Sequence, residues 1–403
     1  MRAPGRPGRG GFAAAATLAV ALAAVAFQLP VFDRSMSFLD EGHLLQFADI
    51  VHRGGELYRD ASSIALPGAF YLLALAFDLF GPSIAVARWI VVLEFTAFAV
   101  MIHLLLRRMA APAVAWLGVA SLFLYKLWVF PHWLMYSYST TAQCLLAGAL
   151  LLVVRHLDAP SRRDLGAAGL LTGLAVLCKQ DYGGAAWIAL NAALLLSARG
   201  RPRPQRPGLA AALTAYNAPV VAVGILTALH FLRQGLLGEM LQQTLVNHWI
   251  GIASGAYSSL PPLWPLFEQT PLFRGPYGIS AYAPAILFTL DWDLLTGSAF
   301  YRKTFLWDAC LKLFFYAPYL IAAFGAARAW RGRAALRDAA RRPDYLRETA
   351  LLLFAAASIL ALNKPVDFVH VGVLYWPFPL LTLLWLGAAL RGRPRAARAV
   401  ALL

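Results

Sequence analysis

The stretch FLDEGHLLQFADIVHRGGELYRD, residues 38–60, lies between two apolar segments and carries five carboxylates: Asp40, Glu41, Asp49, Glu56 and Asp60. Charged side chains are costly inside a bilayer, so a membrane chain would keep such a tract in water. The pattern therefore predicts a loop after the first hydrophobic helix. Within it, the spacing predicts an amphipathic helix over residues 41–53.

The composition is that of a membrane protein. Hydrophobic residues make up 60% of the 403 residues and charged residues 14%. The apolar residues form blocks long enough to cross a bilayer, which predicts an all-α polytopic membrane protein with one domain over residues 1–403. The net charge is +15, but the arginines fall in short loops, where they orient a membrane protein rather than bind nucleic acid.

About ten apolar blocks are expected to span the bilayer, with both chain ends inside. They lie near residues 12–30, 83–106, 112–129, 139–154, 165–178, 183–197, 209–229, 309–327, 349–362 and 371–390. The first is expected to be a retained anchor, with a cleaved signal peptide as the alternative.

A further apolar block at 64–80 is expected to be an interfacial or re-entrant helix. If it spanned, either the basic N-terminus or the later arginine-rich loops would face outward, against the positive-inside bias. Two long outer segments follow from this topology, 31–82 and 230–308, and the second is expected to hold a helix lying on the membrane.

Three motifs in this order resemble a known superfamily. They are LDEGHLLQFADIVHRGGELYRD with LPGAFYLLALAFDLFGPSIAVAR (residues 39–60 and 66–88), GLLTGLAVLCKQDYGG (169–184) and NKPVDFVHV (363–371). The first is similar to the first outer loop of GT-C glycosyltransferases, the superfamily of protein O-mannosyltransferases and lipid A aminoarabinose transferases. The resemblance implies a GT-C fold of transmembrane and interfacial helices.

It also implies a reaction. A sugar would pass from a polyprenyl-phosphate donor in the bilayer to a glycolipid, polysaccharide or protein acceptor on the outer face of the inner membrane, with inversion. Such transfer needs a carboxylate to take the acceptor's proton and cations to hold the departing phosphate.

Four residues carry these roles in the resemblance. Asp40 is the expected base, with the N-cap of the helix at 41–53 as the alternative. Glu41 is expected to bind the acceptor or orient a cation. Lys179 and Arg88 are expected at the donor phosphate; the alternatives are a pair with Asp181 or snorkelling for Lys179, and a pair with Asp78 or Asp60 for Arg88.

Other polar residues have two interpretations each. Tyr58, Arg59 and Asp60 either shape the sugar pocket or form a polar turn. Asp367 and His370, three residues apart, bind a sugar or a metal, or the histidine is structural. His43 and His52 are weaker candidates, Glu94 and His103 are expected to bond across helices, and Gly169 and Gly173 form a GxxxG motif for close helix packing.

The chain departs from the family in LWVFPHWLMYSYST (residues 127–140), which lacks the second acidic residue that some relatives carry there. No cofactor is therefore predicted, and a divalent cation is an open alternative. A membrane transporter or lipid flippase, and a scaffold without activity, are the competing interpretations. A scaffold predicts that the outer polar residues do not converge.

Overall fold

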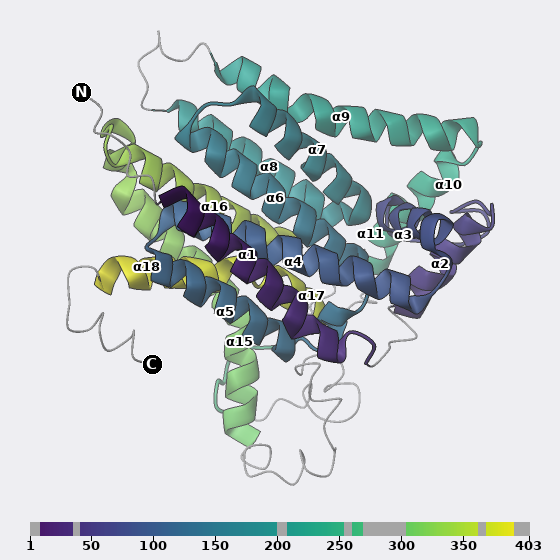
Figure 1. Cartoon of the computed structure of the whole chain (residues 1–403), viewed down its shortest axis with the longest axis horizontal. Coiled ribbons are helices and arrows are strands. Elements are labelled where there is room, and N and C mark those ends of the chain that lie inside the picture. Colours follow the sequence, from purple (N-terminus) through teal and green to yellow (C-terminus); the bar gives the residue numbers. More distant parts are fainter. Residues whose placement is uncertain are drawn as a thin grey trace.

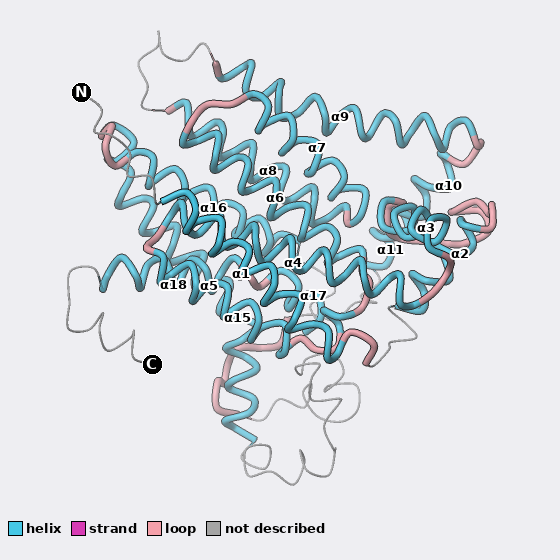
Figure 2. The backbone as a smooth tube through the Cα atoms, viewed as in Figure 1, coloured by secondary structure: helices cyan, strands magenta, loops and turns pink. Residues whose placement is uncertain are grey.

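The computed structural model describes residues 9–34, 41–199, 208–253, 260–268, 304–361 and 368–390, and these form helices joined by short loops (Figures 1 and 2). The helices are α1 (Arg9–Gln28), α2 (His43–His52), α3 (Gly68–Phe80), α4 (Ile84–Met109), α5 (Pro112–Trp128), α6 (Tyr138–Asp158), α7 (Arg162–Cys178), α8 (Gln180–Ala198), α9 (Leu209–Arg233), α10 (Leu237–Leu241), α11 (Asn247–Ala253), α15 (Thr304–Gly332), α16 (Arg342–Ala361), α17 (Phe368–Leu374) and α18 (Pro377–Leu390).

The long helices form a bundle in two layers. In one layer α1, α4, α6, α7 and α9 lie side by side in that order (Figure 1). Helix α5 packs against α4 and α18, and α8 and α16 pack against α6 and against each other. Serine caps begin three of these helices: the hydroxyls of Ser83, Ser137 and Ser161 accept from backbone N–H groups in the first turns of α4, α6 and α7.

The predicted GxxxG packing in α7 is confirmed. A Cβ on Gly169 would lie 1.9 Å from the carbonyl oxygen of Tyr216 in α9, and one on Gly173 would lie 3.1 Å from the Val223 side chain. Only glycine at these positions lets the two helices approach this closely.

Among the residues that the structure describes, five helical segments are long and apolar enough to cross a membrane: Ala13–Val31, Ile84–Met109, Tyr138–Asp158, Leu209–Arg233 and Asp308–Arg337. A sixth is reached if α17 and α18, bent by 46°, count as one broken span. The expected count of about ten is thus not reached by length and hydropathy. The first turn of α7 carries three charged residues, and α5 has 17 residues.

The block at 64–80 forms α3, a helix of only 13 residues. It packs against α2, and both lie with α10 and α11 at one end of the bundle, where α3 is seen nearly end-on (Figure 2). This arrangement agrees with the expectation that the block does not span.

At the opposite end of the bundle, arginines form ion pairs and hydrogen bonds between the helix ends. We call this the basic end; it includes Arg108, Arg328, Arg342 and Arg347. Asp158 at the end of α6 accepts from Arg108 at 2.8 Å and from Arg347 at 2.9 Å. Arg342 donates to the carbonyl of Ser197, and Arg328 to Glu348 at 2.6 Å. The loops that were predicted to share one side of the membrane therefore meet in space.

Candidate functional site

A cavity of about 80 Å³ lies at the end of the bundle away from the basic end. Its wall includes three histidines from separate parts of the chain: His43 of α2, His132 of the loop before α6, and His370 of α17. Residues 137–140, at the start of α6, complete the polar side of the wall. Imidazoles and hydroxyls both donate and accept hydrogen bonds, so this lining suits a hydroxyl-rich ligand.

The loop between α5 and α6 is held rigidly against the bundle. Trp133 in its short helical turn is buried, and Tyr136 is fully buried with its hydroxyl donating to the carbonyl of Ala69 at 2.7 Å. Burial raises the pKa of the Tyr136 phenol well above its usual value, so the proton that makes this bond stays in place. His132 and Tyr138 are thereby fixed on the cavity wall.

Lys179 stands next to this cavity, between α7 and α8. Its side chain is 13% exposed, and Nζ lies 3.8 Å from the Asp181 carboxylate. The ammonium also lies 4.8 Å from the ring centroid of Tyr138, a cavity residue, and 5.3 Å from that of Tyr182. The pairing with Asp181 matches the alternative left open by the sequence, and the aromatic rings add cation–π attraction.

Glu41 and Arg88 form a buried ion pair. Their side chains are 0% and 2% exposed, and both guanidinium contacts with the two carboxylate oxygens are 2.5 Å. Arg88 also donates to the carbonyl oxygens of Phe32 and Arg34, at 3.3 and 3.5 Å. The Glu41 carboxylate is therefore paired with Arg88 within the protein, and its expected role in the site stays a prediction.

The expected alternative partners of Arg88 were wrong. Asp78 pairs with His52 at 2.5 Å, and Asp60 accepts from the backbone N–H of Glu56 at 2.7 Å. Both carboxylates thus have partners near α2 and α3 and do not pair with Arg88.

Asp40 and Asp367 lie outside the described residues. Three residues that follow them in the sequence line the cavity, namely His43 after Asp40, and Val369 and His370 after Asp367. Helix α2 begins at His43 directly after a helical turn at Glu41 and Gly42, and the N-cap alternative for Asp40 lies outside the described residues.

Tyr58, Arg59 and Asp60 form a turn, which is the second of their two expected roles. Tyr58 has a positive φ of 75°, is 3% exposed, and its hydroxyl donates to the carbonyl of Ala65 at 2.9 Å. Arg59 pairs with Glu56 and donates to the carbonyl of Gln234 at 3.3 Å. None of the three is among the residues that line the cavity. The turn instead fastens the loop to the end of α9.

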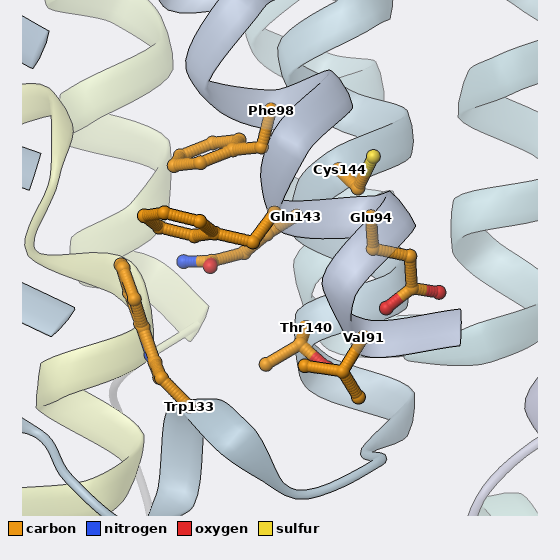
Figure 3. A pocket seen from close by; sticks show the side chains of 8 residues that line it. Val91, Glu94, Phe98, Trp133, Thr140, Gln143 and Cys144 are labelled. Carbon is orange, nitrogen blue, oxygen red and sulfur yellow. The ribbon is translucent and has the colours of Figure 1, made fainter. Parts of the chain in front are cut away.

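A second, smaller cavity of about 20 Å³ lies deeper in the bundle and shares Thr140 with the first (Figure 3). Trp133 and Gln143 stand on one side of it and Glu94 on the other (Figure 3). Glu94 accepts from the hydroxyl of Thr141 in α6 at 2.7 Å, as expected for a bond across helices. His103, expected to do the same, has no hydrogen-bond partner within the described part of the chain and packs on Trp116.

The sequence interpretation missed two groups. His132 lies in a loop without an acidic motif, and its only signal in the sequence was its position between Pro131 and Trp133. Lys126 is 2% exposed inside α5, where Nζ donates to Gln28 at 2.7 Å and to the carbonyl of Trp133 at 2.8 Å. The signal for it was a lone lysine in the apolar run LFLYKLW.

Among the described residues, no group of three His, Cys, Asp or Glu side chains is placed to hold a metal ion. Since Asp40 and Asp367 lie outside those residues, the divalent cation stays an alternative.

No family model and no curated protein matches this chain. A solved structure does: the Archaeoglobus fulgidus oligosaccharyltransferase tethered with an acceptor peptide, with 14% sequence identity and a TM-score of 0.49. The match covers 93% of this chain and 50% of that protein, so this chain spans about half of that protein's length. No residue role and no family assignment is carried over from this match.

Proposed function

We propose that the protein is a membrane glycosyltransferase of GT-C type that works at the cavity lined by His43, His132 and His370. The observation that supports this best is convergence. Three histidines, the start of α6 and the neighbouring Lys179 come from four distant parts of the chain and meet at one end of the bundle. An inactive scaffold gives no reason for such a gathering of polar groups.

The sidedness supports the same proposal. The basic end gathers the arginine-rich loops, and positive loops favour the cytoplasmic side. The cavity lies at the other end, so it would open to the outer face of the inner membrane. There a polyprenyl-phosphate sugar could enter from the lipid and an acceptor from the water.

In the proposed reaction an acceptor hydroxyl attacks the anomeric carbon of the donor from the face opposite the phosphate. The bond between that carbon and the phosphate oxygen breaks, and its electrons leave with the polyprenyl phosphate. In this proposal Asp40 takes the hydroxyl proton, and the ammonium of Lys179 binds the departing phosphate. Inversion at the anomeric carbon follows from the single displacement.

The Glu41–Arg88 pair has a positioning role in this proposal. Arg88 is already bound by a carboxylate and two carbonyls, so it would hold residues 32–41 rather than contact the phosphate directly. His370 and Asp367 are proposed to bind the transferred sugar or the acceptor. The turn at Tyr58, Arg59 and Asp60 is proposed to affect substrate binding only indirectly, by setting the shape of the loop.

Lipid-linked sugars identify the donor and test the proposal. A deletion strain should accumulate one lipid-linked sugar, and the purified protein should transfer that sugar with release of polyprenyl phosphate, followed by mass spectrometry. Asp40→Asn should abolish transfer, whereas Asp78→Asn, a matched change in the same loop, should leave it intact. Movement of the intact lipid across vesicles without any sugar transfer would instead identify a flippase.

A further inference from the structure

A cavity of about 530 Å³ lies at the basic end, between α15 and α16, far from the proposed active site. Its polar rim carries Arg328, Arg331, Tyr345, Glu348 and Thr349. This volume falls within the range of sites that bind small organic ligands, which is roughly 300–1,000 Å³.

The charge at the rim is positive. Glu348 is already neutralised, because one of its oxygens accepts from Arg328 at 2.6 Å and from the indole of Trp385 at 2.7 Å. Arg331 has no ion pair or hydrogen bond to any residue that the structure describes. Seven arginines and three acids occur in residues 328–348, so the surroundings favour an anion as well.

An apolar stripe leads from the bilayer region of α15 to this rim. Leu320 and Phe324 are 59% and 58% exposed, and with Arg328 and Arg331 they follow a spacing of four, four and three residues. That spacing places all four on one helix face. Phe324 and Leu352 also line the cavity, so its floor is apolar where its rim is cationic.

Trp330, next to Arg331, has a setting typical of a membrane surface. Its ring is 68% exposed, and the guanidinium of Arg333 lies 4.0 Å above the ring centroid. Exposed tryptophans beside arginines are typical of the boundary between hydrocarbon and headgroups. A ligand with a negative head at Arg331 and apolar chains along Leu320 and Phe324 matches this geometry.

We propose that the cavity between α15 and α16 binds one anionic phospholipid, with its phosphate at Arg331 and its acyl chains along the exposed face of α15. Basic pockets between transmembrane helices near the cytoplasmic surface bind such headgroups in general. A free phosphate ester fits less well, because it would leave the apolar floor uncovered.

Native mass spectrometry of the purified full chain tests this with phosphatidylglycerol and phosphatidylcholine as probes. Wild type should retain phosphatidylglycerol in preference to phosphatidylcholine. Arg331→Gln should weaken that binding about fivefold, since one basic side chain near the surface contributes about 1 kcal/mol. Arg331→Lys should keep most of it, and glycerol 3-phosphate should not displace the lipid.

Two further variants distinguish a defined lipid-binding site from general electrostatic attraction of the lipid to the basic end. Ala327→Trp fills the cavity without changing charge and should abolish the preference. Arg337→Gln removes a charge from the same segment outside the cavity and should change binding less than twofold. The proposal is overturned if Arg337→Gln and Arg331→Gln weaken binding equally, if Ala327→Trp has no effect, or if both lipids bind alike. Gel filtration and thermal unfolding confirm that each variant is folded.

Discussion

Substitution of Glu41 by Gln probes the buried ion pair that holds the loop after α1. The change keeps the size of the side chain but removes the carboxylate charge that faces Arg88, which is 2% exposed. A guanidinium stays charged at every accessible pH, so it cannot relieve the loss by releasing a proton. Removal of one partner from a buried pair costs about 3–5 kcal/mol. We expect Glu41→Gln to lower the free energy of unfolding by this amount.

Reversible unfolding of the purified protein in detergent gives this free energy. The double variant Glu41→Gln/Arg88→Gln should cost clearly less than the sum of the single changes, because both charges are then absent. Arg53→Gln is the control: its pair with Asp49 is 2.9 Å long, but the arginine is 74% exposed, so the loss should stay below about 1 kcal/mol. Equal effects of Glu41→Gln and Arg53→Gln would refute the reasoning.

Three further predictions concern the loop, the helix packing and the donor. Tyr58→Phe removes a buried hydrogen bond and should cost about 1 kcal/mol. Burial raises the pKa of the Tyr58 phenol, so on raising the pH the unfolded chain releases this proton before the folded protein does. The free energy of unfolding of the wild type should therefore fall above about pH 10, and that of Tyr58→Phe should fall less in the same titration. Gly169→Ala should destabilise the bundle by about 1–3 kcal/mol in denaturant unfolding, because its Cβ would meet the Tyr216 carbonyl, whereas Gly184→Ala, with nothing within 4 Å, should not. Lys179→Gln should raise the KM for the lipid donor, and Lys179→Arg should raise it less because the positive charge is kept. An unchanged KM in both variants would show that Lys179 does not bind the donor.

Helix positions and their grouping at two ends could be predicted from hydropathy and arginine placement. Both signals are local: each block is apolar by itself, and each loop carries its own charge. The contacts of Asp158 with Arg108 and Arg347 confirm the grouping, although these residues come from three different helices, α6, α4 and α16. The number of spans was harder to predict, because short or partly charged helices such as α5 and α7 can still lie inside the bundle.

Side-chain partners could not be predicted where they depend on packing between distant segments. Asp78 and Asp60 were the alternative partners expected for Arg88, yet its guanidinium reaches Glu41 across 47 positions. His132 and Lys126 had no motif to mark them, since a histidine in a loop and a lysine in a helix occur for many reasons. Only the fold brings His132 to the cavity and Lys126 to Gln28.

Chemical labelling of single cysteines tests the central claim most directly, namely that the cavity is an outward-facing site for a polyprenyl-phosphate sugar. In a chain whose native cysteines are replaced, Val369→Cys places a thiol on the cavity wall, and Ala327→Cys places one at the basic end. We expect an impermeant reagent to label position 369 in intact cells and added polyprenyl phosphate to block this labelling. Position 327 should react only after permeabilisation. Labelling of position 327 from outside, or labelling of position 369 that polyprenyl phosphate leaves unchanged, would contradict the central claim.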